Sequence, residues 1–266
     1  MSFFENLILG FVQALLEWLP VSSSGIVSIL ALNAFGKTAS EAFSLSIFFH
    51  LGTAISVLVK YWKTYWDAIS KDRSMLRFLI ISTAFTGIIG IPLYLLLRNF
   101  FVELTGLALT LIIGILLLVT ATLLRTGKIK ATNKFAMEER KISDEIFLGA
   151  CQGLAILPGI SRSGTTVTFL LLRGFKKEDA FKMSFIISLP AILGAVAFEL
   201  LFPNEETAFI FGIEYIVVLL FVAIIGFLTM EALLRFARKM PFDIICYVLG
   251  GITIILVIIF MIVGSS

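Results

Sequence analysis

Apolar residues dominate the chain and are separated by short polar breaks. Apolar runs long enough to cross a bilayer as a helix occupy about 41–62, 75–97, 104–125, 178–200, 212–234 and 242–263. Two further apolar segments, 2–35 and 144–173, are interrupted near their middle by Pro, Gly and Ser. Irregular backbone at membrane depth is tolerated only where protein or a water-filled cavity surrounds it. We therefore predict an all-α integral membrane protein with two re-entrant helix-turn-helix segments and about six full transmembrane helices.

The two interrupted segments resemble each other. Residues 13–25 read Q-A-L-L-E-W-L-P-V-S-S-S-G, and residues 152–164 read Q-G-L-A-I-L-P-G-I-S-R-S-G. Each is followed by three of the long apolar runs, so the chain is duplicated internally. Paired, interrupted hydrophobic segments indicate inverted repeats with a site at their interface, near the bilayer midplane. The single membrane domain, 1–266, then divides into a first repeat at 1–125, a linker at 126–143 and a second repeat at 144–266.

The distribution of charge predicts how the chain is oriented. Basic residues cluster in the connection 60–77 and in the linker, and again near 173–182 and 235–239, whereas 202–211 is acidic. If the basic connections lie in the cytoplasm, the two repeats are inverted and both serine turns meet inside the membrane. We therefore expect a multi-pass protein of the plasma (cell inner) membrane with a cytoplasmic linker and both termini outside.

Composition argues against several classes of function. The chain has 266 residues, of which 59% are hydrophobic, with a formal net charge of +3, two cysteines and one histidine. No CxxC, HExxH or Walker motif is present, which argues against zinc and nucleotide chemistry and gives no reason to expect a nucleic-acid partner.

The polar residues of the two turns form a candidate anion site. A turn of small residues that opens a helix presents free N–H groups and the positive end of the helix dipole, which suit phosphate. Arg162 adds a clamp that matches phosphate oxygens. The other candidate contacts are Ser22, Ser23, Ser24, Gly25, Ser161, Ser163, Gly164 and Thr166. This set predicts a phosphorylated ligand whose apolar part lies in lipid, although the serines can also serve only as helix caps.

Glu17 and Arg162 each occur in only one of the two copies. A charge inside the membrane is a functional hypothesis by default. Glu17 can hold a divalent cation, accept a proton from a nucleophile, or simply pair with Arg162. Gln13 is either a site residue or a bridge between helices. His50, the only histidine, is either a substrate contact or a hydrogen-bonded core residue.

These motifs resemble those of the undecaprenyl-diphosphate phosphatase (bacitracin-resistance) family of integral membrane enzymes. The family motif E/Q-x-x-x-E is matched by 13–17, the adjoining stretch E-F-L-P-V-S-S-T-G by 17–25, and P-G-x-S-R-S-G by 158–164. The stretch H-L-G-T at 50–53 also resembles family members, and the resemblance covers essentially the whole chain. It implies hydrolysis of a polyprenyl diphosphate to the monophosphate and inorganic phosphate, which recycles the lipid carrier for cell-wall glycans.

The resemblance also implies roles for individual residues. Glu17, Ser23 and Arg162 would be catalytic, with Ser23 or water attacking and Glu17 as the base. Glu17 and Gln13 would bind a divalent cation, Mg²⁺ or Ca²⁺, that bridges to the diphosphate. The expected partners are the polyprenyl diphosphate and membrane lipids, and a homodimer is a candidate assembly.

One position departs from the family pattern. Many members have His directly after the glycine of the first motif, where this chain has Ile26. Three outcomes are open: Glu17 is the base, His50 substitutes if the fold brings its helix to the site, or the protein binds the lipid without hydrolysing it efficiently. The alternative functions are a polyprenyl-phosphate flippase that uses the same midplane anion site, or a non-catalytic lipid-binding protein.

Overall fold

The computed structural model describes residues 3–103, 105–202, 213–237 and 239–263. Regular structure within these residues is helical, apart from an isolated β-bridge between Phe135 and Phe175. Six helices are long and apolar enough to cross a membrane. They are α3 (Ala39–Ser70), α4 (Arg73–Glu103), α5 (Gly106–Lys130), α8 (Lys177–Leu201), α9 (Ile213–Ala237) and α10 (Phe242–Val263). The prediction of an all-α membrane protein with six such helices is confirmed.

Four shorter helices form the two interrupted segments. They are α1 (Phe3–Leu16), α2 (Ser23–Asn33), α6 (Ile142–Leu154) and α7 (Arg162–Leu172). Pro20 lies in the first break, where its missing N–H costs no helical hydrogen bond. Gly159 lies in the second break with φ +107°, a conformation that glycine adopts without a steric penalty. The helix breaks therefore lie where the sequence predicts them, and their re-entrant placement in a bilayer stays a prediction.

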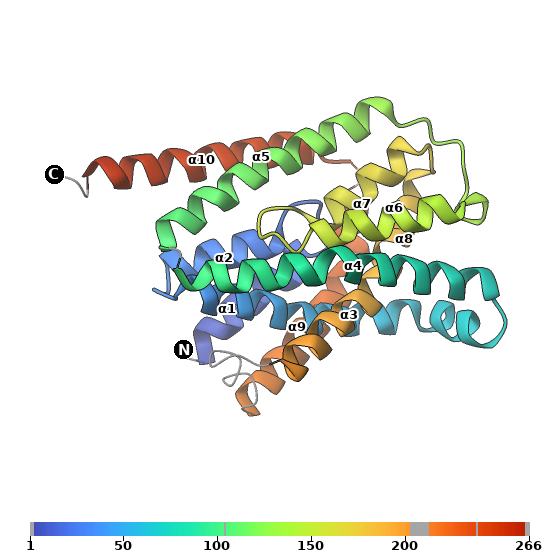
Figure 1. Ribbon diagram of the computed structural model, residues 1–266, viewed down its shortest axis with the longest axis horizontal. Helices are drawn as coiled ribbons and strands as arrows, with labels where there is room; N and C mark the ends of the chain where they lie inside the picture. Colours follow the sequence, from blue (N-terminus) through green and yellow to red (C-terminus); the bar gives the residue numbers. More distant parts are fainter. Residues whose placement is uncertain (1–2, 104, 203–212, 238, 264–266) are drawn as a thin grey trace.

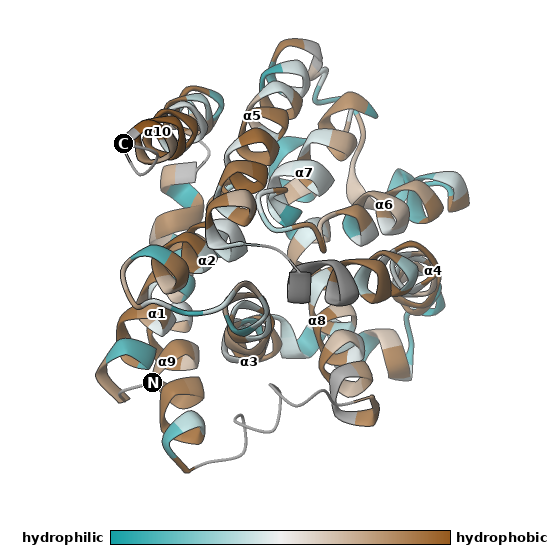
Figure 2. Cartoon of the chain, turned by 60° about the vertical axis from the view of Figure 1, so that its left-hand side comes forward, coloured by the Kyte–Doolittle hydropathy of each residue, from teal (hydrophilic) through white to brown (hydrophobic). Residues whose placement is uncertain are grey.

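The packing of the helices reflects the internal duplication. Helix α1 packs against α9 as its counterpart α6 packs against α4, and two counterpart pairs, α3 with α8 and α5 with α10, pack against each other (Figure 1). Figure 2 shows α3 near the middle of the bundle, with α1 and α9 on one side and α8 on the other. The inverted orientation of the halves and the repeat boundaries stay predictions.

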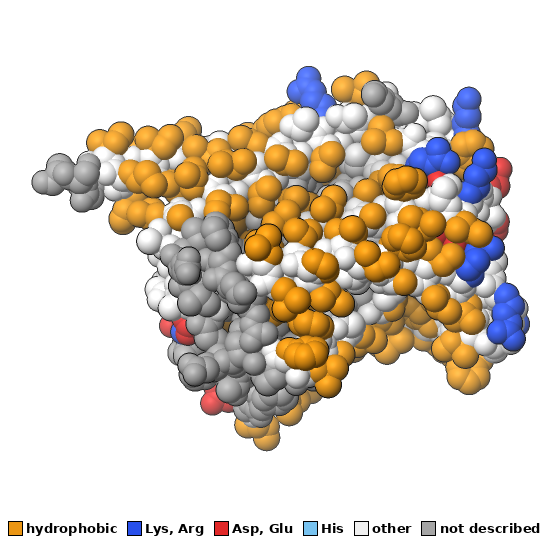
Figure 3. All heavy atoms as spheres, in the orientation of Figure 1, with side chains coloured by type: hydrophobic (Ala, Val, Ile, Leu, Met, Phe, Trp, Pro, Cys, Tyr) orange, Lys and Arg blue, Asp and Glu red, His pale blue; other side chains and the backbone are white. Residues whose placement is uncertain are grey.

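The outer surface is apolar and the polar side chains of the turns are buried. Leu228 of α9 and Phe260 of α10 are each 68% exposed, as expected of side chains that contact lipid. Hydrophobic side chains cover most of the face in Figure 3, and Lys and Arg side chains gather at the end where α3 connects to α4. By contrast, Gln13 is fully buried and Glu17 is 4% exposed. This distribution is that of a multi-pass membrane protein.

Several of the helices extend beyond their predicted ends, including α4, which continues to Glu103. Helix α3 continues to Ser70 after a kink at Tyr61 (φ −112°, ψ 21°), and α5 continues to Lys130. The part of α3 after the kink exposes Trp62 and Trp66, which is typical of a helix at the membrane–water interface. Apolar runs mark only the part of a helix in the lipid, so polar helical extensions are missed. Most of the acidic connection 202–211 and both chain termini lie outside the described residues.

The predicted linker 126–143 is anchored rather than free. It contains the end of α5 and the single-turn helix η1 (Met137–Glu139). Beyond η1, Arg140 lies 3.4 Å from the fully buried carboxylate of Glu145, which also accepts two hydrogen bonds from Arg77 at 3.0 and 3.2 Å. Two cations on one buried carboxylate fix the start of α6 against α4.

The left-handed turn at Gly159 leads to a prediction about stability. A Cβ at this position would lie 2.7 Å from Leu116 Cβ and 2.8 Å from the Ile113 carbonyl oxygen. We expect Gly159→Ala to lower the free energy of unfolding by about 1–3 kcal/mol, because strain and overlap both arise. Gly251→Ala is the control, since a Cβ there meets nothing within 4 Å. Equal thermal unfolding midpoints of the two variants in detergent would contradict this turn geometry.

Candidate active site

Two of the candidate serines are helix caps. Ser22 precedes α2, and its Oγ accepts a hydrogen bond from the Gly25 N–H at 3.2 Å. Ser161 precedes α7 and accepts from the Gly164 N–H at 3.0 Å in the same way. For these two hydroxyls, the capping interpretation describes their hydrogen bonds. The remaining N–H groups of each first turn have no partner within the helix and keep the positive end of the dipole available.

The two turns are in direct contact with each other. The Gly159 N–H donates to Ser22 Oγ at 3.0 Å, and the Ser163 hydroxyl donates to the Leu19 carbonyl at 3.0 Å. A Cβ on Gly25 would lie 3.0 Å from the Gly159 nitrogen, so only glycine allows this approach without displacement. Segments about 140 residues apart therefore form one polar centre, with separations of 137 and 144 residues between bonded partners.

Four side chains contact the carboxylate of Glu17 in this centre. Its Oε2 accepts hydrogen bonds from Gln13 Nε2 and from the Ser23 hydroxyl, both at 2.8 Å. The same oxygen lies 3.2 Å from His50 Nε2. Its Oε1 pairs with the Arg162 guanidinium. The carboxylate is thus oriented by groups from α1, α2, α3 and α7, and a hydroxyl is already hydrogen-bonded to it.

Three contacts hold the Arg162 side chain, one from Glu17 and two from α8. One terminal nitrogen pairs with Glu17, and the other donates to the Ser184 carbonyl of α8 at 3.2 Å. The guanidinium carbon lies 5.4 Å from the centre of the Phe185 ring, within the range of a cation–π contact. The planar guanidinium is therefore fixed in orientation beside the Glu17 carboxylate.

His50 reaches the centre from α3. Its Nδ1 lies 2.5 Å from the Ser46 carbonyl, and its Nε2 faces Glu17. Both partners are hydrogen-bond acceptors, so a doubly protonated ring satisfies both contacts. Ile26, at the position where many family members have His, packs against the hydrophobic cluster that contains Trp18 and is not part of the cavity wall. The imidazole of this chain's site therefore comes from a different helix.

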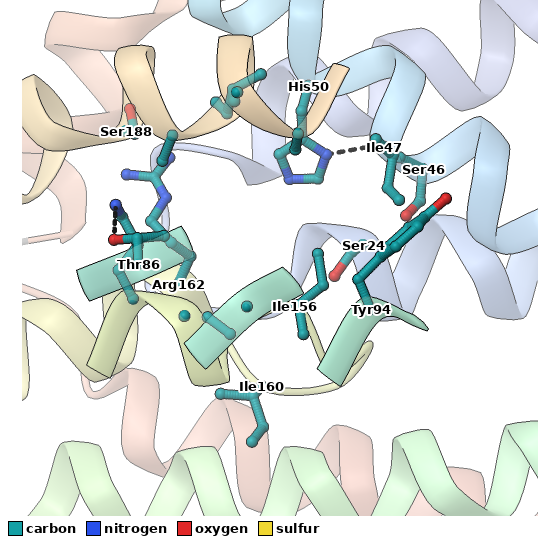
Figure 4. A pocket seen from close by; sticks show the side chains of 18 of the residues that line it. Ser24, Ser46, Ile47, His50, Thr86, Tyr94, Ile156, Ile160, Arg162 and Ser188 are labelled. Carbon is teal, nitrogen blue, oxygen red and sulfur yellow. Dashed lines mark hydrogen bonds between the residues drawn. The ribbon is translucent and has the colours of Figure 1, made fainter. Parts of the chain in front are cut away.

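These groups line one end of a cavity of about 350 Å³. Figure 4 shows Arg162 on one side of the open space, Ser24 and Tyr94 on the other side, and His50 between them along the edge. The candidate residues in its wall are Glu17, Ser22, Ser23, Ser24, His50, Ser161, Arg162 and Ser163. Most of the polar residues in this wall are therefore residues that the sequence singles out as candidates.

Four candidate residues lie behind this wall and do not line it. Gln13 is fully buried against Glu17, and Gly25 packs on the second turn. Gly164 follows its cap, and the Thr166 hydroxyl lies 2.7 Å from both the Arg162 carbonyl and Ser184 Oγ. Direct contact of these four residues with substrate stays a prediction, and in this structure they support the turns behind the wall.

The cavity wall also contains polar residues that were not among the candidate contacts. Gln152 Nε2 donates to Thr86 Oγ1 at 3.1 Å and to the Ile187 carbonyl at 3.2 Å, and Ser188 lies nearby in the wall (Figure 4). Gln152 corresponds to Gln13 in the repeated stretch, and the second half of the chain reads Ser188-Leu189 where the first half reads His50-Leu51, so the internal repeat indicates both residues. Thr86 has no sequence signal, because its place depends on how α4 packs against α6.

The site residues suit a divalent cation only if the substrate phosphates supply some of its ligands. The described residues contain no cluster of three His, Cys, Asp or Glu side chains placed to hold a metal ion. Glu17 contributes a carboxylate, and Gln13 Oε1 is buried without a hydrogen-bond partner. Mg²⁺ usually binds through one or two carboxylates together with substrate phosphates. Glu17 and Gln13 therefore suit an ion that accompanies a diphosphate and do not form a complete protein cage.

The fold and the site define a class of protein, namely an integral membrane protein with a carboxylate, a hydroxyl and a guanidinium converging at two broken helices. Residues 6–252 match the family model described as bacitracin resistance protein BacA, and the chain belongs to this family. It is 41% identical over 256 residues to an undecaprenyl-diphosphatase of Methanothrix thermoacetophila, covering 96% of this chain and 97% of the relative. An undecaprenyl-diphosphatase of Methanococcoides burtonii is 37% identical, with coverage of 96% and 98%. The resemblance identified from the motifs is confirmed.

The buried ion pair leads to a prediction about coupling. We expect Arg162→Met to lower the free energy of unfolding by about 3–5 kcal/mol, because Glu17 is then left buried without this counter-charge. Glu17→Gln removes the charge that needs compensation, so the double variant should be more stable than the sum of the two single effects predicts. Unfolding of all four proteins in detergent measures the coupling. Additive losses would contradict a direct energetic link between the two turns.

Proposed function

We propose that the protein hydrolyses undecaprenyl diphosphate, or a closely related polyprenyl diphosphate, to the monophosphate and inorganic phosphate. The observation that carries this proposal is the convergence of Ser23, Glu17 and Arg162 at one end of a cavity in a family whose curated relatives are named undecaprenyl-diphosphatase. The flippase alternative is not favoured, because relatives over nearly the full chain carry the name of a phosphatase.

Substrate binding would begin with an exchange of partners at Arg162. In the substrate-free site the guanidinium pairs with Glu17. An arriving diphosphate offers more negative charge and a matching geometry, so it competes for the guanidinium. The first-turn N–H groups of α2 and α7 add donors for the same oxygens. This exchange removes one of the cations beside Glu17 at the moment when a base is needed.

The chemical step would use the hydrogen bond between Ser23 and Glu17. Ser23 Oγ, or a water held by the same carboxylate, attacks the terminal phosphorus and passes its proton to Glu17. The bond from this phosphorus to the bridging oxygen breaks, and the polyprenyl monophosphate leaves with that oxygen. If Ser23 attacks, water then cleaves the phosphoserine and inorganic phosphate is released. Arg162 and the turn amides stabilise the charge that develops on the equatorial oxygens.

A divalent cation, Mg²⁺ or Ca²⁺, would neutralise part of the diphosphate charge when bound at Glu17 and Gln13. His50 would assist as a proton donor to the departing bridging oxygen, with its ring oriented by Glu17. Its ring contacts the carboxylate that accepts the Ser23 proton, at 3.2 Å. This arrangement supplies proton transfer in a chain that has Ile26 at the family's histidine position.

We place the protein in the plasma membrane with the basic end in the cytoplasm and both termini outside. Support comes from the gathering of Lys and Arg side chains at the end of the molecule where α3 connects to α4 (Figure 3). Membrane lipids would surround the apolar exterior, and a homodimer stays a candidate assembly.

The phosphatase proposal is tested by phosphate release from undecaprenyl diphosphate. We expect release by the purified protein, its loss in EDTA, and a decrease of about 100-fold or more in Glu17→Gln and Ser23→Ala. Ser28→Ala is a matched control, because Ser28 lies on the same helix as Ser23 and is buried outside the cavity wall. No release by folded wild-type protein would overturn the proposal and favour a flippase.

A second prediction concerns His50. His50→Gln keeps a hydrogen-bonding side chain of similar reach but cannot carry the proton. We expect kcat for phosphate release to fall by about 100-fold with little change in KM, as for a group that moves protons in the transition state. Unchanged kcat would assign all of the proton transfer to Glu17.

A further inference from the structure

Part of the cavity wall, which we call the apolar arm, is lined by hydrophobic side chains and takes no part in the proposed chemistry. Beyond the polar wall it is bordered by Phe43 and Ile47 of α3, Ile91 and Tyr94 of α4, and Ile192 and Phe198 of α8. Tyr94 stacks on Phe43 with ring centres 5.9 Å apart and meets Phe198 edge-on at 5.7 Å, which gives the arm a fixed aromatic surface. The cavity is therefore polar at one end and apolar at the other, as an amphipathic ligand requires.

This arm reaches the apolar exterior between α4 and α8. Ile91 and Gly194 line the cavity and are also exposed at the surface, with Ile91 42% exposed. Their neighbours Ile88 and Leu193 are 60% and 47% exposed and apolar. The cavity therefore has an apolar route to the surface that contacts lipid.

Two glycines leave this route open. A Cβ on Gly194 would meet nothing within 4 Å, and a Cβ on Gly87 would meet only Ile91 of its own helix, at 3.8 Å. Gly52, by contrast, lies where two helices pack closely, because a Cβ on it would lie 2.7 Å from Val222. At Gly87 and Gly194 the missing side chain therefore creates space and does not bring helices together.

We propose that the prenyl chain of the substrate begins in this arm and leaves for the bilayer between α4 and α8, past Gly87 and Gly194. The inference rests on the proposed function, because the occupant is the chain covalently attached to the diphosphate held at Arg162. That chain must start in the same cavity, and the arm is the apolar surface it meets. Gly87 and Gly194 are thus specificity-determining positions for a long lipid.

The test closes the route with a larger side chain. Gly194→Leu and Gly87→Leu are compared with the control Gly251→Leu on α10. A Cβ on Gly251 also meets nothing within 4 Å, and Gly251 does not line the cavity. Each protein is given undecaprenyl diphosphate and, separately, the five-carbon dimethylallyl diphosphate. We expect kcat/KM for the long lipid to fall about 10- to 200-fold in both route variants. Activity on the short diphosphate, and all activity of the control, should stay within about twofold of wild type.

Two outcomes of this assay would overturn the proposal. One is full activity of both route variants on the long lipid. The other is an equal loss on both substrates in folded variants, which would place the effect at the diphosphate site. If wild type releases no phosphate from either substrate, the proposed phosphatase fails, and the route is then tested by binding alone.

The binding test does not depend on catalytic activity, because it measures how fast a cysteine is labelled. Gly194→Cys is introduced together with Cys151→Ser and Cys246→Ser, which removes the two native thiols. Undecaprenyl diphosphate should slow maleimide labelling of this variant, whereas dimethylallyl diphosphate should not. Equal labelling rates with and without the long lipid would overturn the inferred route, whatever the outcome of the phosphatase assay.

Discussion

The structure depends on one buried ion pair between the two halves of the chain. Glu17 comes from the first broken segment and Arg162 from the second, and their side chains are 4% and 14% exposed. Either charge alone would be costly among apolar helices, so each turn is stabilised by the presence of the other. The pair also fixes the position of the Ser23 hydroxyl, because that hydroxyl bonds to the same carboxylate. The same contacts therefore join the two halves of the chain and place the site residues together.

The serines of the turns divide into two groups with different tasks. The hydroxyls of Ser22 and Ser161 accept backbone N–H groups and set the start of a helix, and Ser163 ties the second turn to the first. Ser23 instead donates to Glu17, and Ser24 borders the cavity. A serine-rich turn thus satisfies its own backbone with some hydroxyls and presents others to a ligand. The capping interpretation of the sequence is confirmed for Ser22 and Ser161, and the anion-binding interpretation of the turns stays a prediction.

The sequence predicted the parts of the molecule that depend on local pattern. Apolar length identified the six long helices, and Pro, Gly and Ser identified the two breaks. Which serines cap a helix and which contact Glu17 or the cavity was not predictable, because this depends on how the two turns pack against each other. Thr86 and the ion pairs of Glu145 were missed for a similar reason. Thr86 pairs with Gln152 across 66 residues, and Arg77 pairs with Glu145 across 68, so only tertiary packing shows them.

The same ion pair that stabilises the empty site would also regulate when it becomes reactive. While Arg162 pairs with Glu17, the guanidinium occupies one oxygen of the carboxylate. In the proposed mechanism, a diphosphate that draws the guanidinium away would free this oxygen of Glu17 only when substrate is present. The Ser23 hydroxyl would then be activated in the presence of its target phosphorus, and the guanidinium would remain close enough to stabilise the transition state. An amphipathic substrate with both a diphosphate and an apolar chain would suit this exchange, because the apolar arm of the cavity would hold the chain while the charges rearrange.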